Sequence, residues 1–219
     1  MEHTSVYYQQ PRDEMLPYIP RSVTCTLEVG CGEGIFSDRL KRDFGVEAWG
    51  IEYQEEAASI AAKKLDRVLA GSFDDSFTQL PRNNFDCVIF NDVLEHLVDP
   101  YSALQRTKEL LRKNGVIVAS IPNIRHWPEF VDYTWRGNWN YRNDGVLDRT
   151  HLRFFTKNSL AITVRNCGYE VITLEGINPY RSLWQRVATI ISLGRLSDTL
   201  YKQYAIVIRP IDRSSTVSY

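Results

Sequence analysis

The sequence lacks a long apolar run and carries almost no net charge. Its 219 residues include 26 Lys and Arg against 27 Asp and Glu, for a formal net charge of −1. Such a balance provides no overall field that would attract a nucleic-acid backbone. No apolar stretch approaches the about 18 residues that a membrane-spanning helix needs. These absences predict a protein that neither binds nucleic acid nor crosses a membrane.

Cysteine is also scarce. The four cysteines form no CxxC pair and no framework spacing, which argues against a disulfide scaffold and against a zinc ribbon. The first fifteen residues lack the basic start and apolar stretch of a secretory signal. We therefore expect a cytoplasmic protein, and the length favours one domain over residues 1–219.

Short β-rich runs alternate with helical stretches, which is typical of helices packed around a mostly parallel sheet. The expected strands cover residues 23–29, 46–51, 68–70, 85–90, 116–121, 169–175 and 203–208. The expected helices cover residues 35–44, 54–65, 100–114, 159–167 and 181–200. The pattern predicts an α/β fold with two insertions, an aromatic-rich one at about 123–156 and a helical one at about 180–200.

The second insertion contains an amphipathic helix. Its apolar residues alternate with Arg181, Arg186 and Arg195 at helical spacing. This pattern favours a helix that packs against the sheet or against a second subunit of a homodimer. A helix lying at a membrane surface is the less favoured alternative.

A glycine-rich turn, LEVGCGEG, spans residues 27–34 where the first strand meets the first helix. Open α/β sheets bind their ligands at this point. A nicotinamide fingerprint requires the spacing G-x-G-x-x-G, and the third glycine here comes one residue early. Glu52 then ends the second strand, where a carboxylate can accept hydrogen bonds from both ribose hydroxyls of an adenosine. The combination favours an adenosine-containing cofactor over a tight turn and a capping acid without a ligand.

The chain resembles the class I S-adenosylmethionine-dependent methyltransferases. The resemblance is carried by LEVGCGEG, GIEYQEEA, FDCVIFNDVLEHLVDP and LLRKNGVIVASIPN, which lie within residues 27–123. It implies a Rossmann-like, seven-stranded, mostly parallel sheet whose last strand is antiparallel, with helices on both faces. It also implies S-adenosylmethionine as cofactor and S-adenosylhomocysteine as product.

The same resemblance implies a set of cofactor contacts. They comprise Glu28, Gly30, Gly32 and Gly34 in the loop, Glu52 at the ribose, Ser72 and Phe73 at the adenine, Asn91 beside the methionyl group, and Tyr8 and Arg12 in a segment 1–20 that covers the cofactor. Many family members carry Asp where Ser72 stands. This departure leaves backbone groups as the alternative for the adenine contact.

Asp92-Val93-Leu94-Glu95-His96 holds two acids and a histidine in five positions. An acid followed three residues later by Glu is similar to the capping box that starts a helix. We therefore expect Glu95 and His96 to be structural rather than catalytic, and the sequence shows no metal-ligand cluster of convincing spacing.

Methyl transfer to an alcohol requires a base that removes the hydroxyl proton, and histidine suits this role near neutral pH. His126 and His151 flank the aromatic insertion. His151 is favoured because Asp148, three residues earlier, could orient its ring. The alternatives are a structural His151 and a base at His126.

The acceptor is expected to meet the insertion. Trp127, Trp139 and Tyr141 could stack on a ring, with Arg125 and His126 as polar partners, or these aromatics could simply pack the lid. SIPNIRHW and LDRTHLRFFT resemble methyltransferases encoded beside glycosyltransferases of cell-surface polysaccharide pathways. This resemblance implies O-methylation of a saccharide or a related polar metabolite. A further resemblance, through PN-x-x-HW, to a methyltransferase-like partner of an acyltransferase leaves a non-catalytic, cofactor-binding partner protein as the alternative.

Overall fold

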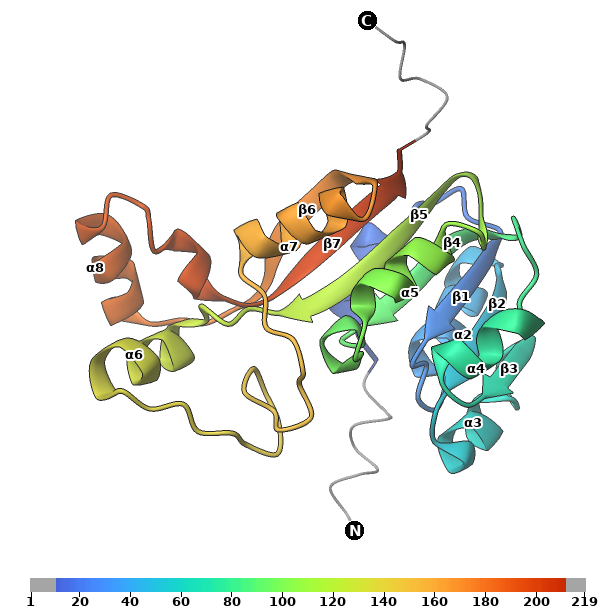
Figure 1. The fold of residues 1–219 in the computed structure, drawn as a ribbon, viewed down its shortest axis with the longest axis horizontal. Coiled ribbons are helices and arrows are strands. Elements are labelled where there is room, and N and C mark those ends of the chain that lie inside the picture. Colours follow the sequence, from blue (N-terminus) through green and yellow to red (C-terminus); the bar gives the residue numbers. More distant parts are fainter. Residues whose placement is uncertain (1–10, 212–219) are drawn as a thin grey trace, which may run out of the picture.

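A seven-stranded sheet forms the centre of the protein (Figure 1). The computed structural model describes residues 11–211. The strand order is β3-β2-β1-β4-β5-β7-β6. The strands are β1 (Cys25–Val29), β2 (Glu47–Glu52), β3 (Arg67–Ala70), β4 (Phe85–Asn91), β5 (Leu111–Pro122), β6 (Tyr169–Pro179) and β7 (Tyr201–Pro210). Strands β1 to β5 pair in parallel, whereas β7 runs antiparallel to both β5 and β6. The predicted fold is therefore confirmed.

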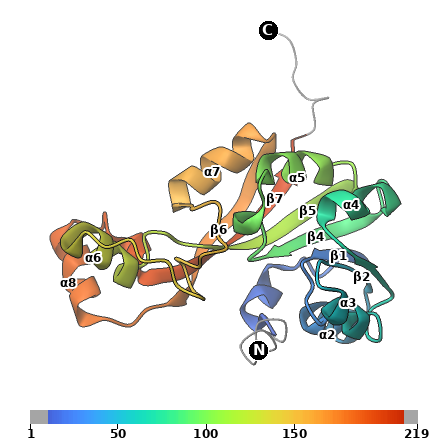
Figure 2. The ribbon, with the colours of Figure 1, turned by 60° about the horizontal axis from the view of Figure 1, so that its bottom comes forward.

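Helices cover both faces of the sheet. The α-helices are α2 (Ile35–Phe44), α3 (Glu55–Ala61), α4 (Phe73–Ser76), α5 (Pro100–Thr107), α6 (Trp127–Arg136), α7 (Lys157–Asn166) and α8 (Leu183–Ile191). Short 3-10 helices are η1 (Asp13–Tyr18), η2 (Phe77–Gln79), η3 (Leu94–His96) and η4 (Ser197–Leu200). Figure 2 shows α4, α5 and α7 on one face and η1, α2 and α3 on the other. Two separate buried apolar clusters follow from this layering, one under each helical layer.

The helix expected over residues 100–114 is shorter than predicted. Asp99 caps its start by accepting a hydrogen bond from the Ser102 amide at 3.0 Å, but α5 already ends at Thr107. Leu111 instead begins β5 and pairs with Phe85 of β4. Asn114, with φ of 66°, lies inside β5, in the stretch where the pairing with β4 shifts register, and not at a helix end. The apolar spacing could not separate these outcomes because both bury Leu110 and Leu111.

The two insertions lie together, beyond the end of the sheet, and carry α6 and α8 (Figures 1 and 2). Of the two favoured alternatives for the helix of residues 181–200, packing against the sheet is not what the structure shows, because α8 lies beside η4, and Leu183, Trp184 and Ile191 are exposed. Packing against a second subunit stays a prediction. Gln185 ties α8 to η4 by donating hydrogen bonds to the Leu196 carbonyl at 3.4 Å and to the Thr199 hydroxyl at 3.3 Å. Across residues 11–211, none of the helices combines the length and the apolar character that crossing a membrane requires.

Gly30 shows how tightly the glycine turn fits the neighbouring loop. Its φ of 71° lies in the left-handed region, and a Cβ there would stand 2.6 Å from Cγ2 of Val93. Gly45 has a similar φ of 69° but open space around the Cβ position. A side chain at Gly45 would therefore meet only backbone strain, whereas a side chain at Gly30 would meet the same strain and a clash with Val93.

We predict that Gly30→Ala lowers the free energy of unfolding by more than Gly45→Ala, whose cost is limited to about 1–2 kcal/mol of left-handed strain. Denaturant unfolding of both variants measures the difference. Adding Val93→Ala should recover part of the Gly30→Ala loss because it removes the clashing methyl group. If both variants lose the same free energy of unfolding and Val93→Ala restores none of it, the loop that carries Val93 moves aside without cost and the prediction fails.

Candidate active site

Hydrogen bonds tie the glycine turn to the end of β2. The amides of Gly30 and Cys31 donate to the carbonyl of Ile51 at 2.8 and 3.0 Å. The Gly32 amide donates to Oε2 of Glu52 at 2.8 Å. The carboxyl ends of β1 and β2 are thereby fixed against each other, at the edge where parallel sheets bind ligands.

Glu52 lies beside a hollow in the surface. Its Oε1 accepts a hydrogen bond from the Gln54 amide at 2.9 Å, so each carboxylate oxygen makes one bond and retains a lone pair. The adjacent open hollow measures about 460 Å³ and is lined by Tyr53, Gln54, Glu55, Glu56, Ala70 and Gly71. A pre-oriented carboxylate beside a hollow of this size suits the ribose of an adenosine.

Glu28 and Asn91 form a buried polar network below the turn. Oε2 of Glu28 accepts from the Ser37 hydroxyl at 2.7 Å, and Oε1 accepts from Nδ2 of Asn91 at 3.0 Å. Oδ1 of Asn91 is buried without a hydrogen-bond partner among residues 11–211. An unpaired buried acceptor is costly, and here it lies at the carboxyl end of β4, beside the turn.

These features fit S-adenosylmethionine. The free Asn91 oxygen can accept from an ammonium group, the Glu52 carboxylate can accept from two hydroxyls, and the turn brings backbone close to both. When bound, this cofactor supplies an electrophilic methyl group on a sulfonium.

The other expected cofactor contacts are placed less directly. Ser72 caps α4 and donates its hydroxyl proton to Asp75 at 2.6 Å, while the Phe73 ring is buried in the core against Phe77 and Phe90. Adenine could therefore meet only the backbone here, in line with the missing Asp at position 72. Arg12 forms an ion pair with Asp92 at the end of β4. Tyr8 lies outside the described residues.

Burial raises the pKa of Glu28 to about 7, although the hydrogen bonds from Ser37 and Asn91 and the charge of Arg12 oppose the shift. The adjacent Cys31 thiol also has a raised pKa because of burial and the nearby Glu28 and Glu52 carboxylates. Folded protein therefore binds the Glu28 proton more tightly than unfolded protein does. The Glu28 contribution to stability is full below the ordinary pKa of 4.5 and is lost as the pH rises to about 7.

We predict that Glu28→Gln flattens this pH dependence. Wild type should lose about 3 kcal/mol more than the variant between pH 4.5 and 7, because each pKa unit corresponds to about 1.4 kcal/mol. Denaturant unfolding at a series of pH values measures the slope of both proteins. Parallel slopes would mean that Glu28 titrates as it does in the unfolded chain.

His151 lies in the loop that follows α6 and returns to the sheet. The loop is docked on η3, because the amides of Leu152 and Arg153 donate to the Glu95 carbonyl at 2.8 and 3.0 Å. Nδ1 of His151 lies 3.0 Å from the Val146 carbonyl. Since a carbonyl only accepts, Nδ1 carries a proton, and in the neutral ring the lone pair is then on Nε2.

The expected orienting residue of His151 needs correction. The Asp148 carboxylate accepts from the amide and hydroxyl of Thr150 at 2.8 and 2.6 Å, and it forms no hydrogen bond to the His151 ring. The Val146 carbonyl orients the ring instead. Asp148 shapes the turn that presents the histidine, and its effect on the ring is limited to charge at a distance.

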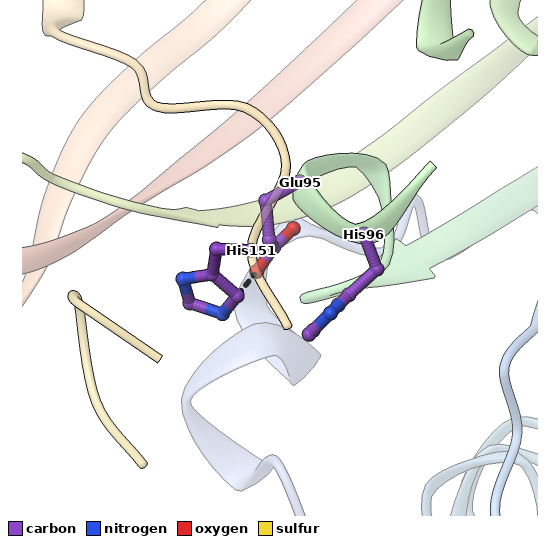
Figure 3. Close-up of side chains that lie close together, drawn as sticks. All are labelled: Glu95, His96 and His151. Carbon is purple, nitrogen blue, oxygen red and sulfur yellow. Dashed lines mark ion pairs between the residues drawn. The ribbon is translucent and has the colours of Figure 1, made fainter. Parts of the chain in front are cut away.

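Glu95 and His96 are the residues whose surroundings the sequence did not indicate. Glu95 is 1% exposed, and neither carboxylate oxygen has a hydrogen-bond partner within the described part of the chain. Burial holds the Glu95 pKa well above its usual range, and the neighbouring Asp92 charge adds to the shift. Oε1 lies 4.0 Å from Nε2 of His151, and the His96 and His151 rings meet edge to face at 4.7 Å (Figure 3).

The capping-box interpretation of residues 92–96 is therefore wrong. Asp92 caps no helix; its φ is 51° and its carboxylate accepts from Ser120, Gln203 and Arg12. Glu95 lies within the short η3, whose start has no side-chain cap. The spacing resembles a cap because Asp92 and Glu95 lie three residues apart. In the fold, the loop that carries His151 covers Glu95 instead.

The predicted acceptor residues divide into two groups. Phe154, next to His151 in the loop, contacts the rings of Trp139, Tyr141 and His151 at centroid distances of 5.5, 6.4 and 6.3 Å. Trp139 and Tyr141 are 40% and 52% exposed. The structure therefore places a partly exposed aromatic cluster beside His151.

The second group lies at the base of α6. Nδ1 of His126 is 2.6 Å from Oε2 of Glu129, and Arg125 forms an ion pair with Asp198 at 3.3 Å. Trp127 stacks on Phe130 and lines a hollow facing α8. The Arg125 ion pair ties the start of α6 to η4, and the hollow lies between α6 and α8.

Comparison with known proteins shows the family. A family model described as a methyltransferase domain matches residues 1–174. The chain belongs to this methyltransferase domain family. The expectation of an S-adenosylmethionine-dependent methyltransferase is confirmed, and its cofactor is S-adenosylmethionine.

Similar proteins agree with the family and bear on the acceptor. A ubiquinone biosynthesis O-methyltransferase of Bradyrhizobium diazoefficiens is 33% identical over 121 residues, which cover 51% of this chain and 46% of the relative. One from Aromatoleum aromaticum is 26% identical over 82% of this chain and 76% of its own length. A SAM-dependent methyltransferase structure from Archaeoglobus fulgidus has a TM-score of 0.68 at 19% identity, covering 94% and 93% of the two chains, which shows a shared fold. The chain thus spans about half the length of the first relative, and neither curated name mentions polysaccharides.

Proposed function

We propose that this methyltransferase transfers the methyl group of S-adenosylmethionine to a hydroxyl oxygen of a saccharide or a related polar metabolite. The observation that carries the proposal is the orientation of the His151 ring. Its Nδ1 faces the Val146 carbonyl, which leaves Nε2 as the atom that can take a proton, and an exposed aromatic cluster lies beside the ring. Aromatic faces stack on the apolar faces of sugar rings.

In this proposal the protein positions the hydroxyl and takes its proton. Nε2 of His151 accepts the proton while the oxygen forms a bond to the methyl carbon. The carbon–sulfur bond breaks, its electron pair stays on sulfur, and S-adenosylhomocysteine leaves uncharged at that atom. The remaining task is to align the acceptor and exclude water, which Trp139 and Tyr141 would serve.

A second candidate acceptor is a hydroxyl of a ubiquinone precursor. The curated relatives carry ubiquinone biosynthesis in their names. Exposed apolar side chains on α6 and α8, among them Trp135 and Trp184, would also suit an acceptor with a lipid-like part.

The acceptor class can be tested with isotope-labelled methyl groups. Host extract is incubated with labelled S-adenosylmethionine and either wild type or His151→Ala, then separated into saccharide, quinone-containing lipid, protein and nucleic-acid fractions. Label in the saccharide fraction that depends on His151 supports the proposal. Label in the lipid fraction would contradict the saccharide proposal and favour a quinone-type acceptor. Absence of label in every fraction, although the cofactor binds, would favour a non-catalytic partner protein.

A further inference from the structure

We propose that Glu95, His96 and His151 form a binding site for a divalent transition-metal cation such as zinc. The three side chains converge from η3 and from the docked loop (Figure 3). Sequence spacing does not indicate such a site, because His96 and His151 are 55 positions apart.

The ligand atoms have suitable spacing. One atom from each residue lies within 4.8 Å of the other two, and the Nε2 of His151 is 4.0 Å from Oε1 of Glu95. Ligands bonded to one cation at about 2.1 Å lie about 3–3.5 Å apart. Shifts of about 1–2 Å in the ligand atoms, made by side-chain rotation, therefore complete the site.

Both imidazoles are held in the form that binds a metal. Nδ1 of His151 donates to the Val146 carbonyl at 3.0 Å, and Nδ1 of His96 donates to the Thr150 carbonyl at 3.3 Å. In the neutral form of each ring the lone pair is therefore on Nε2. Backbone carbonyls that fix the tautomer in this way are the usual partners of metal-binding histidines.

Glu95 supplies the second, independent observation. Its side chain is 1% exposed, and both oxygens lack a hydrogen-bond partner among the described residues. A buried carboxyl group without a partner is strongly unfavourable, and a cation would satisfy it. The nearby acids are not equivalent to Glu95, because Asp92 and Asp148 already accept hydrogen bonds from neighbouring side chains.

The donor set indicates the class of metal. Two imidazoles and one carboxylate favour zinc and similar transition metals over magnesium or calcium, which prefer oxygen ligands throughout. Three protein ligands also leave a coordination position for another molecule, as catalytic zinc sites do.

This inference rests on the proposed function for its role in catalysis. An acceptor hydroxyl bound at the open position would lose its proton to water more readily, because a cation lowers the pKa of a bound hydroxyl. The resulting oxygen attacks the methyl carbon, and the carbon–sulfur electron pair stays on sulfur. His151 would then act as a ligand, and its lone pair would not be available as a free base.

Metal binding can be measured without any acceptor. Chelator-treated protein is titrated with Zn²⁺ by calorimetry and with Co²⁺ by visible absorption. We expect one equivalent per chain and an absorption spectrum typical of mixed nitrogen and oxygen ligands. His151→Ala and Glu95→Gln should each weaken binding by more than about 100-fold, beyond the effect of losing an outer hydrogen bond to a ligand.

His126→Ala is the matched control, since His126 also lies beside a buried glutamate, Glu129, at 2.6 Å but outside the cluster. It should retain the full stoichiometry. Circular dichroism checks that each variant is folded. If His151→Ala does not fold, Glu95→Gln still tests the site, because glutamine has nearly the same shape as glutamate. Absence of Zn²⁺ and Co²⁺ binding, or equal binding in Glu95→Gln and wild type, would overturn the metal site.

Turnover separates this inference from the proposed function. If methyl transfer requires the cation, chelation abolishes it and Zn²⁺ restores it. If chelated protein transfers methyl groups at the full rate, the metal role fails, while the proposed function stands with His151 as base. If metal binds but no acceptor is methylated, the metal site stands and the proposed function fails.

Discussion

Replacing Glu52 with Ala should raise the dissociation constant for S-adenosylmethionine by about 100-fold or more. The side chain is pre-oriented by the amides of Gly32 and Gln54 and adjoins the hollow beside β2 and β3. Each charge-assisted hydrogen bond to a ribose hydroxyl contributes about 1.5–3 kcal/mol, and two of them would be lost. Isothermal titration calorimetry with wild type and variant measures the change.

Two controls make the Glu52 result specific. Glu47→Ala changes an exposed glutamate at the opposite end of β2 and should leave cofactor affinity unaltered. Glu52→Gln keeps one acceptor oxygen and should fall between wild type and Glu52→Ala. The unfolding temperature without cofactor shows how much of any loss comes from the turn itself. Wild-type affinity in Glu52→Ala would place the ribose elsewhere.

His151→Ala should lower turnover by about 100- to 10,000-fold, the range typical for the loss of a general base. The loss is expected in both roles of His151, as the base itself or as a ligand of the cation that acidifies the hydroxyl. The dissociation constant for S-adenosylmethionine should stay nearly unchanged, because the expected cofactor contacts lie on other elements, at the ends of β1, β2 and β4. Single-turnover rates and calorimetry on the same protein separate the two quantities. If the rate is retained, His151 takes no part in the reaction.

Local sequence patterns predicted the sheet and the glycine turn. β1, β2 and β4 are short and almost wholly buried, so continuous apolar runs mark them. The turn was recognisable because glycines at positive φ stand where a strand meets a helix, and Glu52 follows within the next strand. These signals are local, which is why one sequence suffices.

The cluster around Glu95 could not be found in the same way. Its character depends on the loop of residues 137–156 folding back onto η3, with Leu152 and Arg153 bonded to the Glu95 carbonyl. Within residues 92–96 the pattern is compatible with a helix cap. The different role of Glu95 depends on His151, which is distant in the sequence and lies beside Glu95 in the fold. The exposure of α8 was equally hidden, because an amphipathic pattern does not say what covers the apolar face.

The most direct test of the account is the chemical form of the transferred methyl group. Purified protein, ¹³C-methyl S-adenosylmethionine and the acceptor fraction are combined, and NMR identifies the atom to which the labelled carbon is bonded. We predict a methoxyl carbon formed in equal amount to S-adenosylhomocysteine, with wild type but not with His151→Ala. A methyl group on nitrogen, carbon or sulfur, or methoxyl formation that persists without His151, would contradict the account.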